Sequence, residues 1–327
     1  MSTLLLETRE PELQIVDLDT IRPPELEGFF RRELALWRDR LSWDVSSAVT
    51  AFRRALERGG VLGKAIRCGS STAGYGYFVV ESGRGVLTGL AVAPEWRARD
   101  VGPLLVRAMI QELVLRGVVR IESQFLSYDA PWLVPCFESE GFESYAREFR
   151  RLALKPRGSC PPCPEEPPET PDPFIYRSWK SWNLTEASQV MESAHVSGID
   201  ARMNELYRSS EGCRSLLTSV LRHRGCGSAI LDASSVARDP RTDRAVAFAV
   251  VTETSVRKAH LAQLAVAPDY QGRGLGRRIL SRVIGRLSDM GYDGISLMVS
   301  RDNHRALDLY RSMGFERVIA FPVFSRD

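Results

Sequence analysis

Hydrophobic and polar positions alternate along the chain with two periods, and these periods predict a mixed α/β fold. Alternation every second residue predicts strands, and apolar residues three and four apart predict helices. In the second half, the expected elements in chain order are helices over 184–197 and 215–221, strands over 228–236, 244–252 and 258–266, a helix from 275, a strand over 294–299, a helix over 303–313 and a strand over 318–324.

The first half predicts the same order of elements. Its expected elements are a strand over 13–18, helices over 24–40 and 45–58, and strands over 61–66, 74–80 and 86–92. Gly59 and Gly60 end the second of these helices, as glycine does at helix ends. We expect each half to contain one strand, two helices, three strands, a helix, a strand, a helix and a final strand, in that order.

A direct sequence repeat supports two copies of one fold. The segment Leu90–Pro94 reads L-A-V-A-P, and the same five residues recur at Leu264–Pro268, an offset of 174 residues (264 − 90). At this offset Gly102 aligns with Gly276. A repeat this long indicates two domains rather than a solenoid array.

The domain boundaries follow from the repeat and from a proline-rich stretch between its copies. Residues 155–173 contain repeated prolines, which cannot form the interior of a helix or sheet and predict an extended spacer. We expect an N-terminal arm over 1–12, a first domain over 13–154, the linker over 155–173 and a second domain over 174–327. The pair would form an intramolecular pseudo-dimer.

Composition narrows the class of protein. With 44 basic and 41 acidic residues among 327, the net charge of +3 gives no reason to expect nucleic-acid binding. No apolar run reaches the length of a membrane span, and the apolar run at the start is too short for a signal peptide, so we expect a cytoplasmic protein that does not bind membranes. Cys160 and Cys163 are spaced like metal ligands, but a zinc site needs two more ligands, and we expect no metal.

A glycine-rich segment follows the strand over 258–266. Gly272 and Gly274 lie between that strand and the helix beginning at Leu275, and Gly276 lies in the first turn of that helix. A glycine-rich turn at a helix start presents unpaired N–H groups and the positive end of the helix dipole, an arrangement that binds phosphate. The dinucleotide fingerprint would require glycine at position 277, which is arginine, and the P-loop motif is absent.

The motif Q-G-R-G-L-G behind L-A-V-A-P resembles the acetyl-CoA pyrophosphate loop of the GNAT acyltransferase superfamily. The resemblance covers both halves, is specific in the second and degraded in the first, and implies a mostly antiparallel mixed sheet with a splayed central strand pair that admits pantetheine. It implies acetyl-CoA as cosubstrate and the following contacts in the second domain: Leu264, Ala265, Val266, Gln271, Gly272, Arg273, Gly274, Leu275, Gly276 and Asn303.

The resemblance also implies catalytic roles. Tyr310 matches the family's tyrosine that protonates the leaving thiolate, although its spacing also suits a core aromatic. A backbone N–H near Val266 would stabilise the carbonyl oxygen. His260 is the expected general base, Glu253 is the alternate, and a surface histidine at a strand start is the plain alternative for His260.

The first copy lacks these groups. At the aligned positions Gln271, Gly272 and Gly274 become Arg97, Ala98 and Asp100, and Tyr310 becomes Phe137. A carboxylate in a phosphate cradle repels the ligand, and added Cβ atoms restrict its approach. We expect the first domain to be catalytically inactive.

These observations predict an acetyl-CoA-dependent N-acetyltransferase that acts in its second domain on a primary amine. The acceptor is expected to be a small molecule or a protein N-terminus. The resemblance implies that the first helices and loops of the domain bind it, and in the second copy these include Met203–Arg208 and nearby His195. The alternative from another class is a non-catalytic acetyl-CoA sensor or scaffold.

Overall fold

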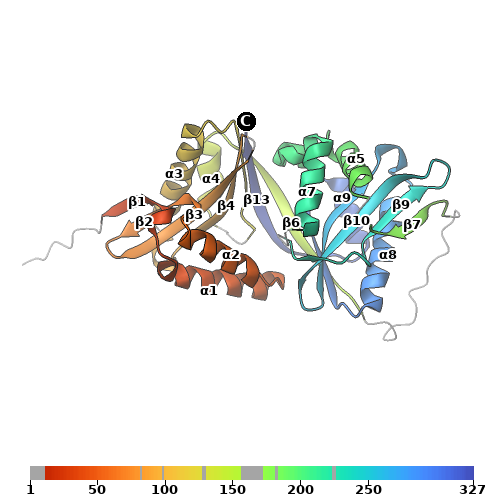
Figure 1. Ribbon diagram of the computed structural model, residues 1–327, viewed down its shortest axis with the longest axis horizontal. Helices are drawn as coiled ribbons and strands as arrows, with labels where there is room; N and C mark the ends of the chain where they lie inside the picture. Colours follow the sequence, from red (N-terminus) through yellow and green to blue (C-terminus); the bar gives the residue numbers. More distant parts are fainter. Residues whose placement is uncertain are drawn as a thin grey trace, which may run out of the picture. The chain divides into compact units, whose positions relative to one another are not determined.

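The structure, a computed structural model, describes residues 12–81, 83–97, 99–126, 130–155, 172–180, 183–222 and 226–327 (Figure 1). Residues 1–11 of the expected arm, residues 156–171 of the expected linker, and with them Cys160 and Cys163, lie outside the described residues. The described chain divides into two compact units. The first falls within Met1–Ala35, Ser46–Ser144 and Phe324–Asp327, and the second comprises Leu36–Val45 and Tyr145–Val323.

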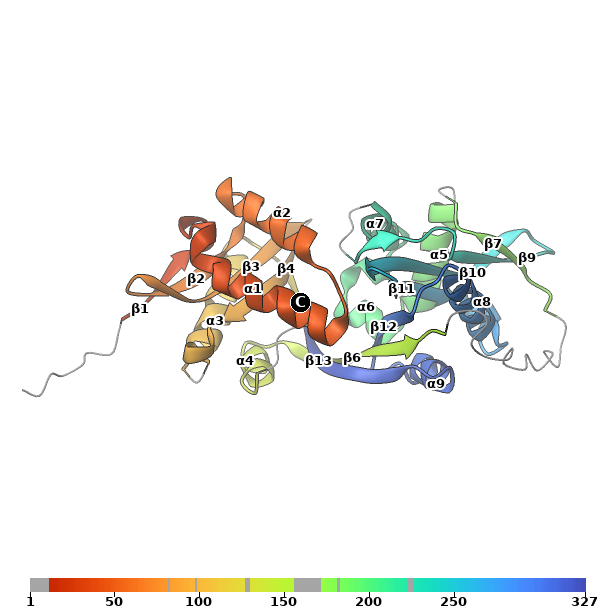
Figure 2. The ribbon, with the colours of Figure 1, turned by 90° about the horizontal axis from the view of Figure 1, so that it is seen from below.

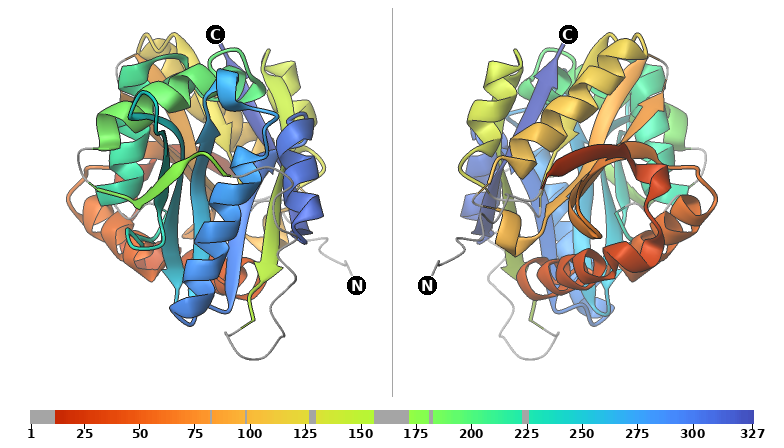
Figure 3. Two further views of the ribbon diagram at one scale, coloured as in Figure 1. Left: turned by 90° about the vertical axis from the view of Figure 1, so that its right-hand side faces the viewer. Right: turned by 90° about the vertical axis from the view of Figure 1, so that its left-hand side faces the viewer.

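The first unit is a sheet in the order β1-β2-β3-β4-β5, antiparallel except for the parallel pair β4 and β5. Its strands are β1 (Leu13–Asp17), β2 (Leu62–Cys68), β3 (Ser71–Glu81), β4 (Arg84–Val92) and β5 (Arg120–Gln124), and its helices are α1 (Glu27–Leu36), α2 (Ser46–Glu57), α3 (Val101–Leu115) and α4 (Leu133–Ser139). Aromatic residues of α1 and α2 pack on Tyr75, whereas α3 packs on the opposite face of β3, against Gly74 (Figure 3).

The second unit is a sheet in the order β13-β6-β12-β11-β10-β9-β7 (Figure 2). Its strands are β6 (Glu143–Ala153), β7 (Ile175–Ser178), β8 (Ser228–Ala229), β9 (Ser235–Asp239), β10 (Arg244–Ser255), β11 (Lys258–Val266), β12 (Gly294–Ser300) and β13 (Glu316–Arg326); its helices are α5 (Asn183–His195), α6 (Ile199–Met203), α7 (Ser210–Arg222), α8 (Leu275–Asp289) and α9 (His304–Ser312). The pair β11 and β12 is parallel.

Strand β10 is covered on both faces. Ala247, Ala249 and Val251 lie in one apolar cluster with residues of α8, whereas Phe248 and Val250 lie in another with residues of α5 and α7. Successive side chains of a strand point to opposite faces, so α8 and the α5–α7 pair cover opposite sides of the sheet (Figure 3, left). This double burial explains the nearly continuous apolar run that predicts the strand.

Both units contain the same bulge and the same splay, at the same offset of 174 residues. In the second unit Ala262 is the extra residue between the pairs Val250↔Gln263 and Val251↔Leu261, and the pairing of β11 with β12 ends at Leu261. In the first unit Thr88 is the extra residue, and the pairing of β4 with β5 ends at Leu87. A bulge bends its strand. The strands therefore part at the same place in each copy, and the expected tandem fold with splayed central strands is confirmed.

The two units differ from the expected domains in which strands they contain. β6 lies at the end of the first copy in sequence, yet it pairs with β12 in the second unit, from Gly294↔Ala153 to Ser300↔Arg147. Conversely, Phe324 near the chain end belongs to the first unit, where its ring stacks on Phe137 at 4.0 Å between centroids. An alternating pattern predicts that a segment is a strand but does not specify its partner strand, so the expected boundary at 154 did not include this exchange.

Local differences from the expected elements are few. The segment expected as one strand over 228–236 contains the short strands β8 and β9, and α6 was not predicted. Helix α7 begins five residues earlier than expected, at Ser210. Within the part of the chain that the structure describes, no helix is both long enough and apolar enough to cross a membrane.

Candidate active site

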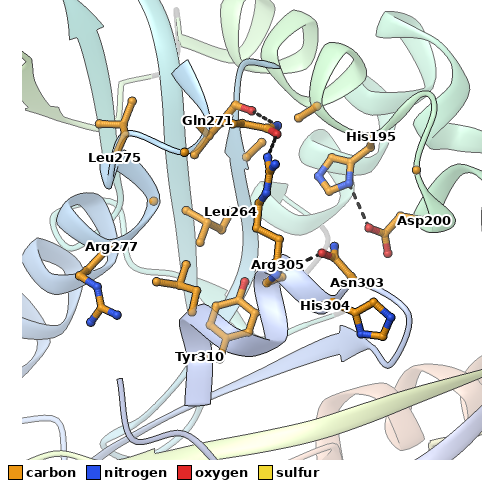
Figure 4. Close-up of a pocket in the computed structure, with 18 of the residues that line it drawn as sticks. His195, Asp200, Leu264, Gln271, Leu275, Arg277, Asn303, His304, Arg305 and Tyr310 are labelled. Atoms are coloured by element: carbon orange, nitrogen blue, oxygen red, sulfur yellow. Dashed lines mark hydrogen bonds and ion pairs between the residues drawn. The ribbon is translucent and has the colours of Figure 1, made fainter. Parts of the chain in front are cut away.

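The second unit contains a pocket of about 650 Å³ at the point where β11 leaves β12. The end of β11, the glycine-rich loop, the first turn of α8, helix α9 and the turn between α5 and α6 form its walls (Figure 4). Of the residues expected at the site, the pocket is lined by Leu264, Ala265, Val266, Gln271, Gly272, Gly274, Leu275, Gly276, Asn303 and Tyr310. The sequence motif and the downstream tyrosine thus meet in one cavity.

The glycine-rich loop has a backbone that only glycine adopts readily. Gly272 and Gly274 have φ angles of +75° and +76°, and no atom lies within 4 Å of a Cβ built on either. Gly274 is the N-cap of α8, whose first N–H groups have no partner within the helix. The loop therefore leaves open space and a helix dipole at one end of the pocket, which fits a pyrophosphate.

Polar side chains connect this loop to the neighbouring elements. The Gln271 side-chain amide donates to the carbonyl oxygen of Val266 at 2.9 Å, and its oxygen accepts from Arg305. Arg277 reaches Ser312 on α9. Arg277 and Arg305 thus place positive charge beside the loop (Figure 4), where it would favour a phosphate ligand.

The splayed edge of β11 presents free backbone groups to the pocket. Ala267 donates its N–H to the carbonyl oxygen of Val246 on β10. Successive N–H groups of a strand point to opposite edges, so those of every second residue, counted back from Val266, point away from β10. Those residues include Leu264 and Val266, which lie beyond the last pair between β11 and β12. Their N–H groups are positioned for an extended ligand, or for the oxygen of a carbonyl group.

Tyr310 lies at the base of the pocket. Its ring packs edge-on against Phe315 at 5.7 Å, and its hydroxyl points into the pocket (Figure 4). Burial, and then the charge of Asp200, raise the pKa of this phenol above its usual value, against a lowering effect of Arg147. The phenol therefore remains protonated over the working pH range and can donate a proton.

Asn303 connects two elements of the site. Its side-chain oxygen accepts the N–H of Ala306 at 3.2 Å and so caps α9. Its side chain also hydrogen-bonds Asp200. Asn303 lines the pocket as expected, and its contacts show how it positions α9 relative to α6.

The pocket also contains a histidine–carboxylate pair that the sequence did not single out as catalytic. His195 ends α5 and Asp200 lies in α6, and Nδ1 of the histidine is 3.1 Å from Oδ2 of the aspartate. Both line the pocket. The spacing His-x-x-x-x-Asp carries little information, because a five-residue separation brings side chains together only when a turn reverses the chain.

The two expected bases lie elsewhere in the unit. His260 is buried between the rings of Trp43 and Phe149 and hydrogen-bonds Ser296 at 3.0 Å. Glu253 accepts a hydrogen bond from Tyr292. Neither residue lines the pocket, and neither does Arg273, which lies over the ring of Tyr270. Spacing along β11 could not reveal this, because Trp43 and Phe149 come from the first half of the sequence.

The environment of His260 predicts acid lability. Burial, and then the charge of Arg147, lower its pKa to about 3. A histidine in an unfolded chain protonates near pH ~6.5. Between these values the unfolded state binds the extra proton, so the free energy of unfolding falls as the pH falls. Between pH 7.0 and pH 5.5 we expect this residue to lower the free energy of unfolding, measured in urea, by about 1–1.5 kcal/mol.

The variant His260→Phe is the test of that assignment, because it removes the titrating group and keeps an aromatic ring. Its stability should depend less on pH than that of the wild type over the same window. The control variant His304→Gln, at an exposed position, should retain the wild-type slope. An unchanged slope in His260→Phe would contradict the assignment.

At the equivalent place in the first unit, side chains fill the space that is open in the second. A Cβ on Gly102 would lie 2.0 Å from the ring of Trp132, whereas the aligned Gly276 has no heavy atom nearer than 3.5 Å. Asp100 has a φ of −71°, in contrast to +76° at the aligned Gly274. Phe137, aligned with Tyr310, is fully buried.

Comparison with known proteins agrees with this geometry. Residues 205–315 match the Acetyltransferase (GNAT) family. A [ribosomal protein bS18]-alanine N-acetyltransferase of Salmonella typhimurium is 42% identical over 73 residues, which are 22% of this chain and 49% of the relative. A mycothiol acetyltransferase of Thermobifida fusca is 47% identical over 51 residues, 16% of each chain. The chain thus spans about half the length of the first of these relatives.

Solved structures are similar over nearly the whole chain. A GCN5-related N-acetyltransferase from Sphaerobacter thermophilus superposes with a TM-score of 0.67 at 16% identity, covering 96% of this chain and 95% of that one. A tandem GNAT protein from the clavulanic acid biosynthesis pathway superposes with a TM-score of 0.59 at 14% identity, covering 96% and 98%. At these identities the likeness establishes the fold alone.

Proposed function

Because residues 205–315 form a domain of the GNAT acetyltransferase family, we propose that the chain is an N-acetyltransferase whose active site is the pocket of the second unit. The acetyl donor would be acetyl-CoA, and the acceptor would be a primary amine. The single observation that supports this most is the convergence of the glycine-rich loop, the splayed edge of β11 and Tyr310 in one cavity.

The residues present fit the donor. The open backbone at Gly272 and Gly274, with Arg277 and Arg305 beside it, suits a pyrophosphate. Leu264 and Val266 offer backbone N–H groups along the gap in the sheet, where pantetheine amides would find partners. A bound acetyl thioester would supply an activated carbonyl carbon.

The chain's own groups then have distinct tasks. The N–H of Val266 faces the gap and can hold the carbonyl oxygen as negative charge develops on it. The Tyr310 hydroxyl can give a proton to the departing sulfur. Arg147, from the strand β6 that joins this unit, places its positive charge near Tyr310 and so eases the loss of that proton.

We further propose that the first unit does not catalyse the reaction. The Trp132 ring against Gly102 takes up the position where the second unit has open space. The buried Phe137 offers no proton in place of Tyr310. Asp100 adds negative charge where a pyrophosphate would lie.

Acceptor chemistry is suggested by the relatives. Among them, one is named a [ribosomal protein bS18]-alanine N-acetyltransferase, another an N-alpha-acetyltransferase, and a third a mycothiol acetyltransferase. The α5–α6 side of the pocket carries Asp200, with Asp302 on the opposite wall, and a cationic amine would be attracted there. Both peptide N-termini and small primary amines are therefore candidates.

Calorimetry with acetyl-CoA, followed by an acceptor panel, tests the proposal. We expect one acetyl-CoA per chain, and release of free thiol when a peptide with N-terminal alanine, glucosamine or a comparable primary amine is added. Two acetyl-CoA sites per chain would contradict the proposal that the first unit is inactive. If the protein binds acetyl-CoA but acetylates no amine, the result would favour a non-catalytic acetyl-CoA sensor. If it does not bind acetyl-CoA, the proposal that it is an N-acetyltransferase would be overturned.

Gly274→Ala should weaken acetyl-CoA binding about tenfold, because alanine at positive φ costs about 1–2 kcal/mol and the loop would move away from the geometry that holds the phosphates. Calorimetric Kd values measure this effect. Gly285→Ala is the matched control, since this glycine lies within α8, outside the pocket, with open space around its Cβ. Equal Kd values for the two variants would remove the loop from the binding site.

A further inference from the structure

The turn after α5 holds His195 and Asp200 against each other at the edge of the pocket. Gly198 donates its N–H to the carbonyl oxygen of His195 at 2.8 Å, and α6 begins immediately afterwards. Arg208 donates to the carbonyl oxygen of Ala201 at 2.9 Å, which anchors α6 from the other side. The two side chains are only 15% and 13% exposed. This pair is fixed by its supporting structure rather than by a chance surface contact.

The hydrogen bond determines which ring nitrogen carries the proton. An ionised carboxylate can only accept, so the 3.1 Å contact with Oδ2 of Asp200 places the proton of the neutral imidazole on Nδ1. Nε2 then presents its lone pair. In the described part of the chain this Nε2 is buried and has no hydrogen-bond partner. A buried acceptor without a donor costs about 1–3 kcal/mol, and a ligand that brings a donor would recover it.

The surroundings keep Asp200 ionised. Burial by itself would raise its pKa, but the hydrogen bond from His195, the charge of Arg147 and the hydrogen bond from Asn303 lower the pKa below its usual value. The His195 ring lies 4.8 Å from the ring of Tyr207, which is held by Gln263. The other titratable groups that line the pocket are Tyr270, Arg277, Asp302, His304, Arg305 and Tyr310. Glu192, on α5 itself, does not line the pocket.

We propose that His195 is the general base that deprotonates the acceptor amine, and that Asp200 is the positioning residue that holds its Nε2 lone pair toward the amine. This inference rests on the proposed acetyltransferase function and adds the general base, to which that proposal gave no residue. His260 and Glu253 lie outside the pocket. His304 lines the pocket but is exposed, and among the described residues no hydrogen bond or ion pair joins its ring to a carboxylate.

The proton balance of the step is complete with the groups present. The ammonium form of the acceptor gives one proton to Nε2, and the proton then passes to solvent. The neutral nitrogen forms the C–N bond to the thioester carbonyl carbon, and the C–S bond breaks. The leaving sulfur takes a proton from Tyr310, and the second nitrogen proton restores the tyrosine. The products are an amide, a free thiol and one released proton.

Steady-state kinetics of His195→Gln and Asp200→Asn test the inference, with the panel amine that the wild type turns over best. At pH 7, we expect His195→Gln to lower kcat/KM by about 10²-fold or more, because a positioned base contributes about 10²–10⁴-fold. Asp200→Asn should lower it at least about tenfold. The deficit of His195→Gln should shrink as the pH is raised toward 9.5, because more of the amine is then neutral without help.

Two readouts separate a base from a merely structural histidine. The acetyl-CoA Kd of both variants should remain within about twofold of the wild type, since the donor end of the pocket is unchanged. In proton–nitrogen NMR of the protein alone, the His195 ring should show the Nδ1–H form, and adding the amine should shift its Nε2 signal in the wild type more than in Asp200→Asn. Glu192→Gln, one helical turn earlier on α5, is the matched control and should retain wild-type rates.

The outcomes distinguish this inference from the function on which it rests. If the wild type transfers acetyl groups and both variants keep kcat/KM within about twofold at every pH, the base assignment is overturned while the enzyme stands. If His195→Gln is slow by the same factor at pH 7 and pH 9.5, the histidine is structural. If the wild type acetylates no amine of the panel, the proposed function fails, and this inference fails with it.

Discussion

Tyr310→Phe is expected to lower kcat by about 10²-fold or more while leaving the Kd of acetyl-CoA within about twofold, because it removes only the proton for the departing sulfur. The ring itself should still pack against Phe315. The first unit shows that phenylalanine is tolerated at this place in the fold, since the aligned Phe137 is buried and packs edge-on against Phe142 at 5.0 Å. Rapid-mixing measurements of thiol release would report the chemical step directly.

A second tyrosine of the same unit provides the control. Tyr292 is partly buried and donates to Glu253 at 3.2 Å, outside the pocket. Tyr292→Phe removes a phenol in the same way and should leave kcat within about twofold, a result that would also argue against Glu253 as the base. If the two variants had equal kcat values, the phenol of Tyr310 would have no part in the reaction.

Residues 174–327 expressed alone are expected not to fold, although they contain the whole second copy of the repeat. The second unit also needs β6 and Leu36–Val45. Without them β12 loses its antiparallel neighbour β6, and His260 loses the rings of Trp43 and Phe149 that pack on it. The burial of each of these two side chains is worth about 1.5–3 kcal/mol. Natural stability margins are about 5–15 kcal/mol, so the fragment should have little or none left.

Coexpression of residues 174–327 with residues 1–154 is the complementary experiment. That fragment carries both missing segments, so we expect the pair to copurify and to bind acetyl-CoA, whereas 174–327 alone should give an NMR spectrum with little dispersion. Cooperative unfolding of the isolated fragment, at the melting temperature of the full chain, would refute the need for β6. The comparison thus tests whether the second unit needs segments from the first half of the sequence in order to fold.

Much of the fold could be predicted because the signals are local. The apolar run of β10, the alternation along β11 and the two glycines after α2 follow from neighbouring residues in the sequence. The repeat at offset 174 compares two such local patterns, and the bulges at Thr88 and Ala262 show that it extends to backbone irregularities. The glycine-rich loop could be predicted for the same reason, because φ angles near +75° favour glycine wherever they occur.

The histidines show where this reasoning stops. His260 lies on the strand that leads to the glycine-rich loop, and the family resemblance suggested it as the general base. The fold instead places it between Trp43 and Phe149, where burial disfavours its charged form. His195 had no motif to distinguish it, and only the turn before α6 brings Asp200 to its ring.

The sequence by itself determined the strands and helices, the duplication and the glycine-rich loop, because each depends on residues close together in the chain. The tertiary structure decided which sheet β6 and Phe324 join, which residues surround His260, and which side chains meet at the pocket. Those outcomes depend on contacts between segments that are not neighbours in the chain, and for β6, Phe324 and His260 the contacting segments are more than a hundred residues apart. No local pattern encodes such pairings, because strand alternation and helix periodicity specify which face is buried but not what buries it.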